Sequence, residues 1–218
     1  MILPNDNASP LNGLVLAGGM STRMGRNKAL MKWHDKEQQY YLADMLMNLC
    51  EDVFISCRKE QEKDLNSTYK SLPDTFFDVG PLGGILSAFQ LEPGRAWLVV
   101  ACDLPLVNEE TLQFIITNRN ITNIATAYKN PSDGLPEPLI TIWEPESYPV
   151  LLTSLENKVT SPRAVLMNSA ITMLQVPYPE ALLNANTPED AAAINKMLDE
   201  RRKNNQPTQL LHERNQRP

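Results

Sequence analysis

The chain alternates short apolar runs with segments of helical periodicity, and this alternation restricts the folds that it can adopt. Several runs of strand length are apolar at nearly every position, which is typical of strands covered on both faces. Strands that alternate with helices favour a doubly wound sheet. We therefore predict an α/β fold with a mainly parallel sheet and helices on both faces. The predicted strands are Leu14–Ala17, Val53–Cys57, Trp97–Ala101, Ile124–Tyr128 and Leu139–Trp143, and the predicted helices are Tyr40–Leu49, Leu82–Gln90 and Thr111–Asn118.

A further helix is predicted near the end of the chain. Thr187 is a suitable cap, Pro188 suits the first turn, and Asp190 stands three residues after the cap. Beyond Leu198 the sequence becomes polar and charged, which indicates a frayed helix end and a mobile tail. We predict a flexible N-terminus over residues 1–11, one globular domain over 12–198 and a polar C-terminal tail over 199–218.

Composition and charge limit the partners and the compartment. A net charge of -6 over 218 residues argues against broad binding to nucleic acids or membrane surfaces. No apolar run approaches the roughly 18 residues of a membrane span, and the first residues lack the pattern of a signal peptide. The three cysteines, Cys50, Cys57 and Cys102, have no CxxC spacing and fit buried thiols in a reducing compartment. We expect a cytoplasmic protein without nucleic-acid or membrane partners.

The segment LAGGMSTRMGRNKAL, residues 16–30, follows the first predicted strand. Gly18 and Gly19 allow main-chain amides to approach an anion closely, and Arg23 and Lys28 add positive charge suited to phosphate. In doubly wound sheets, ligands bind beyond the carboxyl ends of strands, where this loop lies. The spacing matches neither the Walker A motif nor GxGxxG. We predict a phosphate-binding loop; the alternative is an ordinary glycine-rich turn with solvated cations.

Asp103 stands at the carboxyl end of the apolar run AWLVVA. A carboxylate in this place is suited to a hard cation, because Mg²⁺ takes one or two carboxylates together with phosphate oxygens and water. We therefore predict that Asp103 binds a metal ion next to the phosphates. The alternative is that Asp103 only caps a turn or the next helix, but Asn108 is already a plausible cap for that helix.

A third stretch, LPDTFFDVGPLGG, places Asp74 shortly before a second glycine-rich turn. Gly83 and Gly84 open a helix there and offer another surface for close approach. Asp74 could accept hydrogen bonds from a nucleobase or ribose, and Asp78 is its rival for this role. Each of them could equally be an ordinary loop acid.

Together these motifs resemble those of the molybdenum cofactor guanylyltransferases, within the nucleotidyltransferase superfamily. The resemblance runs in order over about residues 11–198. The motifs that carry it are L-A-G-G-x3-R-M-G-x2-K (Leu16–Lys28), D-x5-G-P-L-x-G (Asp74–Gly84), C-D-L-P (Cys102–Pro105), P-E-P-L (Pro136–Leu139) and N-x-N-T-P-E-D (Asn184–Asp190).

The resemblance implies a Rossmann-like fold and a Mg²⁺-dependent transferase of molybdenum cofactor biosynthesis, which moves GMP from GTP to molybdopterin and releases pyrophosphate. It also implies contact with molybdoenzyme maturation proteins. Family members that use CTP tend to carry Leu-Ala-Ala-Gly, so Gly18 favours GTP. The residues implied are Lys28, Arg23 and Asp103 for catalysis, Asp103 for the metal, Leu16, Ala17, Gly18, Gly19, Lys28, Asp74 and Asp103 for the nucleotide, and Asn184, Asn186 and Pro138 for the acceptor.

Two departures and three alternatives remain open. Asn27 stands where many members have Asp, and WHDKEQQYYLAD replaces the common Gly-Lys-Pro-Leu stretch, which leaves the acceptor undecided. The chain could be a nucleotidyltransferase that uses CTP or a sugar-phosphate acceptor, a non-catalytic nucleotide-binding protein, or a structural α/β domain.

The proposed reaction needs no general base. A phosphate nucleophile is already anionic, since its second pKa is about 6. His34, a lone histidine, is expected at the surface.

Overall fold

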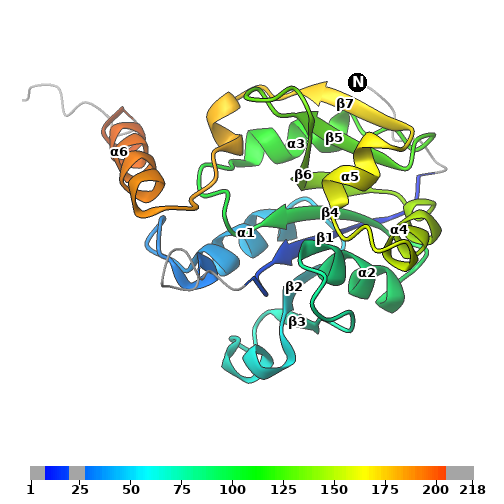
Figure 1. Cartoon of the computed structure of the whole chain (residues 1–218). Helices are drawn as coiled ribbons and strands as arrows, with labels where there is room; N and C mark the ends of the chain where they lie inside the picture. Colours follow the sequence, from blue (N-terminus) through cyan, green and yellow to red (C-terminus); the bar gives the residue numbers. More distant parts are fainter. Residues whose placement is uncertain (1–7, 20–27, 205–218) are drawn as a thin grey trace, which may run out of the picture.

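The structure is a computed structural model, which describes residues 8–19 and 28–204. Over these residues, seven strands form one sheet in the order β3-β2-β1-β4-β6-β5-β7 (Figure 1). Neighbouring strands run parallel, except that β6 is antiparallel to both β4 and β5. The predicted mainly parallel sheet is therefore confirmed. The strands are β1 (Leu11–Leu16), β2 (Val53–Cys57), β3 (Lys70–Pro73), β4 (Ala96–Ala101), β5 (Ala125–Lys129), β6 (Pro136–Trp143) and β7 (Ile171–Gln175).

Helices cover both faces of this sheet, as predicted. Along β4, Leu98 and Val100 join the apolar cluster under α1 and α3, whereas Trp97 and Val99 join the cluster under α2, α4 and α5. This alternation explains why the central strand is apolar at every position. The described helices are α1 (Gln38–Met47), α2 (Pro81–Leu91), α3 (Glu109–Thr117), α4 (Ser147–Glu156), α5 (Pro162–Met167) and α6 (Pro188–Asn204), with 3₁₀ turns η1 (Lys28–Leu30), η2 (Lys59–Asp64) and η3 (Pro179–Leu182).

The reversed strand β6 is the main difference from a uniform βα alternation. β5 and β6 are joined by residues 130–135 without a helix, so the two strands form an antiparallel hairpin. Trp143 pairs with Trp97 at the start of β4, and Ile140 pairs with Val100 near its end. The beginning of β6 therefore lies beside the carboxyl end of β4.

The C-terminal helix α6 begins as predicted. The Asp190 amide donates to Thr187 Oγ1 at 3.1 Å, and the Asp190 carboxylate accepts from the Thr187 amide at 2.9 Å. The helix continues past Leu198 to Asn204, so its last turns include residues that we assigned to the polar tail. Within the described part of the chain, no helix has the length and apolarity needed to cross a membrane.

Gly83 sets how closely α2 approaches the loop before it. A Cβ atom at this position would lie 2.4 Å from the main-chain oxygen of Phe76, which has no side-chain freedom to move away. We expect Gly83→Ala to lower the free energy of unfolding by about 1–3 kcal/mol, the usual cost of overpacking. Urea unfolding measures this change. Gly94→Ala is the control, because a Cβ there meets no atom within 4 Å; equal stability of the two variants would contradict the prediction.

Candidate active site

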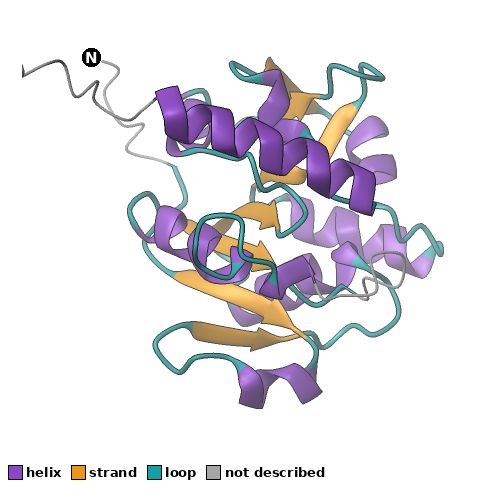
Figure 2. Cartoon of the chain, turned by 90° about the vertical axis from the view of Figure 1, so that its left-hand side faces the viewer, coloured by secondary structure: helices purple, strands orange, loops and turns teal. Residues whose placement is uncertain are grey.

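The two motifs that follow β1 and β4 meet at one edge of the sheet. Leu16 and Ala101, the last residues of these strands, are paired in the parallel register, and the Cys102 amide donates to the Leu16 carbonyl at 3.2 Å. In Figure 1 the arrows of β1 and β4 point to the side on which α6 lies, and Figure 2 views that side. The loop after β1 and Asp103 after β4 thus open on the same edge, as predicted from the sequence.

Lys28 joins these two motifs to the segment before α6. Its Nζ atom lies 3.8 Å from Asp103 Oδ2 and donates a hydrogen bond to Asn186 Oδ1. The Lys28 and Asp103 side chains are 19% and 20% exposed, so solvent reaches both groups only in part. The amide of Ala185 donates to the Asp103 carbonyl at 2.9 Å. Three segments distant in sequence therefore converge around one ammonium group and one carboxylate.

Asp103 combines burial with an incomplete set of partners. Burial raises the pKa of its carboxyl group, the Lys28 ammonium opposes this rise, and Glu137 adds to it. Its Oδ1 atom is shielded from solvent and has no hydrogen-bond partner among the described residues. A buried carboxylate oxygen without a donor is costly unless a ligand satisfies it. This geometry suits a cation bound at Oδ1.

Glu137 lies near Asp103, although the sequence motifs gave it no predicted role. Its side chain is only 1% exposed and accepts hydrogen bonds from Asn130 Nδ2 at 2.9 Å and Arg163 Nη2 at 3.2 Å. Its charge reaches Asp103 because the reversed β6 brings its first residues beside the end of β4. The signal was the P-E-P-L motif, in which we named only Pro138. Pro138 lies on β6 in this region, and its role toward the acceptor remains a prediction.

Asp74 lies against the first glycine-rich loop, on the side of β2. Ser56 Oγ donates to Asp74 Oδ1 at 2.7 Å, and a Cβ at Gly18 would lie 3.1 Å from Asp74 Oδ2. Burial raises the pKa of Asp74, and the Ser56 hydrogen bond partly offsets this rise. The rival residue Asp78 is exposed and has a positive φ of 59°. Of the two acids, Asp74 is the one beside Gly18, and its contact with the nucleotide remains a prediction.

The remaining predicted nucleotide residues lie at the start of the same loop, directly after β1. The amide of Ala17 donates to the Ser56 carbonyl at 3.0 Å, which fixes the main chain just before Gly18. Gly19 is exposed, and a Cβ there would meet no atom within 4 Å, so the space beside it is open. Arg23 lies outside the described residues. Its predicted contribution to phosphate binding therefore stays a prediction.

The two asparagines assigned to the acceptor lie at the site but differ in their contacts. Asn186 Oδ1 accepts from Lys28, which places this side chain beside the Lys28 ammonium group. Asn184 Oδ1 is shielded from solvent and has no hydrogen-bond partner among the described residues. Asn184 directly precedes Ala185, whose amide donates to the Asp103 carbonyl, so its main chain belongs to the segment that contacts the end of β4.

His34 and the cysteines are not arranged for catalysis. His34 was expected at the surface, and it is half-buried there: it stacks on Tyr41 and contacts the Pro105 carbonyl at 2.8 Å. A carbonyl only accepts, so His34 Nε2 carries the proton, and burial lowers the pKa of the ring. Cys57 and Cys102 are buried, and Cys50 is half-buried. Burial raises the pKa of all three thiols, which makes them poor nucleophiles.

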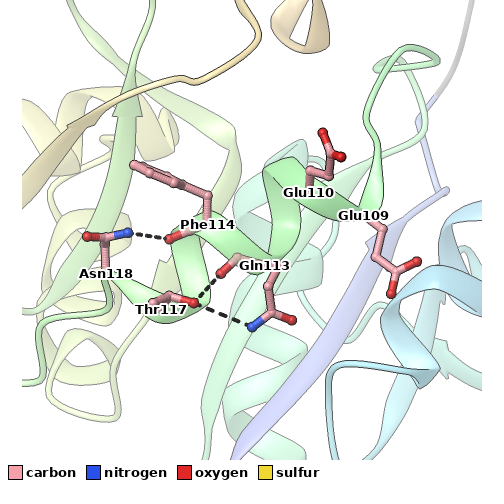
Figure 3. Close-up of a pocket in the computed structure, with 6 residues that line it drawn as sticks. All are labelled: Glu109, Glu110, Gln113, Phe114, Thr117 and Asn118. Carbon is pink, nitrogen blue, oxygen red and sulfur yellow. Dashed lines mark hydrogen bonds between the residues drawn. The ribbon is translucent and has the colours of Figure 1, made fainter. Parts of the chain in front are cut away.

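A separate hollow of about 620 Å³ lies on the outer surface of α3 and is not the candidate site. Figure 3 shows that all the residues lining it come from this helix and its end. The polar groups near its C-terminus bond within the helix, including Asn118 to the Phe114 carbonyl and Thr117 to the Gln113 carbonyl. It contains no residue of the motifs described above. Polar groups from several elements converge around Lys28 and Asp103 instead.

Several curated proteins resemble this chain over most of its length. A molybdenum cofactor biosynthesis bifunctional protein of Synechocystis is 34% identical over 190 residues, which are 86% of this chain and 54% of the relative. The chain thus spans about half the length of that relative. Probable molybdenum cofactor guanylyltransferases of Carboxydothermus hydrogenoformans and Bacillus subtilis are 32% and 30% identical, and the matches cover 84% and 83% of this chain and 94% and 92% of the relatives.

Solved structures share the fold at lower sequence identity. Molybdopterin-guanine dinucleotide biosynthesis protein A from Archaeoglobus fulgidus has a TM-score of 0.74 at 21% identity and covers 87% of this chain and 99% of its own. A 4-diphosphocytidyl-2C-methyl-D-erythritol synthase from Anaerococcus prevotii has a TM-score of 0.66 at 12% identity, covering 88% and 96%. At these identities, the likeness shows the α/β fold alone.

The family model supplies the assignment. The model described as the MobA-like NTP transferase domain matches residues 13–172, which include the β1 loop, the Asp74 loop, Asp103 and the P-E-P-L motif. Together with relatives at 30% identity or more, this match confirms the resemblance read from the sequence. The chain belongs to the MobA-like NTP transferase domain family of nucleotidyltransferases.

Proposed function

We propose that this protein transfers GMP from GTP to molybdopterin and releases pyrophosphate. The observation that carries the proposal is the convergence of Lys28 and Asp103, 3.8 Å apart, at the adjacent carboxyl ends of β1 and β4. The printed names of the guanylyltransferase relatives support the choice of nucleotide and acceptor. Gly18 supports GTP over CTP, because family members that use CTP tend to carry alanine at this position. An alanine here would crowd the Asp74 carboxylate.

A divalent cation fits the residues present, and we propose Mg²⁺. Asp103 offers a shielded carboxylate oxygen that accepts from no donor in residues 8–19 and 28–204, and Asn184 offers a shielded amide oxygen. Both are hard oxygen ligands of the kind that Mg²⁺ prefers. No group of three or more His, Cys, Asp or Glu side chains is arranged for a metal within the described part of the chain. Mg²⁺ is commonly held by one or two carboxylates, with phosphate oxygens and water as its other ligands.

The chemistry requires binding and charge neutralisation more than proton transfer. An oxygen of the acceptor phosphate attacks the α-phosphorus of GTP, the bond to the β-phosphate oxygen breaks, and pyrophosphate leaves with its electron pair. The Lys28 ammonium is placed to offset the charge that builds on the leaving group. A bound Mg²⁺ would supply further charge neutralisation on the phosphates. His34 takes no part, since its proton is held by the Pro105 carbonyl.

The direct test is a panel of nucleotides. Purified protein with Mg²⁺ and molybdopterin is supplied with GTP, CTP or ATP, and pyrophosphate release and the product are measured. We expect release with GTP and formation of the guanylyl product. Release with CTP would instead favour the cytidylyl alternative, with which the fold is equally compatible. Binding of GTP without turnover would favour a nucleotide-binding protein that is not an enzyme.

Loss of the Lys28 ammonium should weaken the handling of phosphate. We expect Lys28→Ala to lower kcat/KM for GTP roughly 10- to 150-fold. This factor corresponds to the loss of about 1.5–3 kcal/mol, the free energy of a charge-assisted contact. Initial rates of pyrophosphate release measure the change. Lys32→Ala is the matched control, because Lys32 is exposed and follows on the same segment. Unchanged kinetics of Lys28→Ala would remove Lys28 from the site.

A further inference from the structure

Asp190, in the first turn of α6, fixes the main chain of the segment that reaches into the site. Its Oδ2 atom accepts from the amides of Asn186 at 3.1 Å and Thr187 at 2.9 Å, and its own amide donates to Thr187 Oγ1 at 3.1 Å. A carboxylate that accepts two adjacent amides holds that stretch of main chain in one conformation. The consequence for Asn186 is a fixed position of its Cα and Cβ atoms.

The Asn186 side chain, placed in this way, contacts Lys28. Its side-chain oxygen accepts from Lys28 Nζ, and the same Nζ lies 3.8 Å from Asp103 Oδ2. The Ala185 amide, one residue earlier, donates to the Asp103 carbonyl. A continuous series of contacts therefore runs from Asp190 through Asn186 to the ammonium group and the proposed metal ligand.

The helix α6, which carries Asp190, packs in an apolar cluster separate from those on the two faces of the sheet. Ile194 and Leu198 of α6 pack with Trp33 and Leu106 in a small apolar cluster of their own. Figure 2 shows α6 lying across the side of the molecule to which β1 and β4 point. Lys28 is thus held from two sides: from its own segment after the β1 loop, and from the turn before α6.

We propose that Asp190 is a positioning residue: it holds Asn186, and Asn186 holds the Lys28 ammonium where the phosphates of the nucleotide bind. The inference rests on the proposed function, since it takes Lys28 as the group that meets the phosphates. The two main-chain hydrogen bonds lower the pKa of the Asp190 carboxyl group, and the Lys28 charge adds a smaller effect in the same direction. Asp190 is therefore ionised at neutral pH and accepts both amides fully.

A double-mutant cycle on GTP affinity tests this coupling. Asp190→Ala, Lys28→Ala and the double variant are titrated with GTP and Mg²⁺ by calorimetry, which requires no acceptor and no turnover. We expect Asp190→Ala to weaken GTP binding about three- to tenfold when Lys28 is present, within the range of coupling between residues in one network, and to have no further effect when Lys28 is absent. An equal loss in both backgrounds would show that Asp190 only stabilises the helix and would overturn the proposal.

Two further variants separate positioning from helix stability. Glu189→Ala removes an exposed carboxylate from the same turn of α6, and we expect it to leave GTP affinity unchanged. Asp190→Asn keeps one side-chain oxygen, which can accept the two amides that Oδ2 accepts but carries no charge. We therefore expect it to restore part of the affinity, and it serves in the cycle if Asp190→Ala does not fold. A loss in Glu189→Ala equal to that in Asp190→Ala would also overturn the proposal.

The outcome is distinguishable from a failure of the proposed function. Pyrophosphate release by the wild-type protein with GTP and acceptor reports on the reaction, whereas the cycle reports on affinity alone. A wild-type protein that binds GTP but forms no product would contradict the reaction and leave the cycle to decide the role of Asp190. A wild-type protein that binds none of GTP, CTP and ATP would overturn both.

Discussion

Asp103→Asn is expected to lower kcat for pyrophosphate release by about 10²–10³-fold, the usual cost of removing one group that stabilises developing charge. Asparagine has nearly the same size and retains one oxygen, so the packing at the end of β4 should survive. The substitution removes the negative charge that lies 3.8 Å from Lys28 and that we propose to bind Mg²⁺. The rate is measured over a range of Mg²⁺ concentrations with GTP and acceptor.

The stability of the same variant separates a site defect from a folding defect. The Asp103 carboxylate is held at a cost, because burial raises its pKa and Oδ1 has no hydrogen-bond partner among the described residues. Asp103→Asn should therefore unfold at a temperature no lower than that of the wild-type protein. Asp78→Asn is the matched control: its residue is exposed with a φ of 59°, a conformation that asparagine tolerates. Unchanged kcat in Asp103→Asn would exclude Asp103 from the mechanism.

The sequence predicted the centre of the fold better than its edges. β2 was predicted with its observed bounds, and β1 and β4 within a few residues, because a strand buried on both faces is apolar at consecutive positions. The edge strands β3 and β7 were not predicted, since they are short and partly exposed and so lack that pattern. The direction of β6 was also beyond reach of periodicity, because it depends on a short connection and on pairing with β4.

Some contacts of the candidate site could be predicted from the sequence, and others depend on how distant segments fold together. The loop after β1 and Asp103 were predicted to meet because adjacent parallel strands end at one edge, and Leu16 does pair with Ala101. The bond between Lys28 and Asn186 joins segments far apart in the chain, and nothing in either segment indicates the other. The proximity of Glu137 to Asp103 depends on the reversed strand, so it appeared only with the structure.

The buried ion pair between Arg119 and Glu144 is expected to contribute strongly to stability and not at all to nucleotide binding. Arg119 Nε and Nη2 donate to the two Glu144 oxygens at 2.7 and 2.6 Å, and the side chains are only 10% and 2% exposed. Removing one partner leaves an uncompensated buried charge, so Glu144→Ala should lower the free energy of unfolding by about 3–5 kcal/mol. For a chain of this size, that corresponds to a fall in Tm of roughly 6–20 °C.

Two further variants test whether the loss of stability comes from the unpaired buried charge. Replacing both partners, as Arg119→Met with Glu144→Leu, removes the unpaired charge, so the loss of stability should be much smaller than in Glu144→Ala. Glu146→Ala, which changes an exposed carboxylate two residues away, should be close to neutral. Urea unfolding measures all three. A loss below about 1 kcal/mol in Glu144→Ala would place the pair among weak surface interactions instead.

The ion pair between Arg119 and Glu144 lies far from the candidate site along the strands. Its removal therefore tests whether GTP binding depends on the stability of the whole sheet. Glu144 follows Trp143, which pairs with Trp97 at the start of β4, whereas Asp103 follows the end of that strand. The ion pair and the site therefore lie at opposite edges of the sheet. At temperatures where Glu144→Ala is still folded, its Kd for GTP should equal that of the wild-type protein. A weakened Kd there would mean that the sheet transmits strain between its edges, and the geometry around Lys28 would then depend on the whole scaffold.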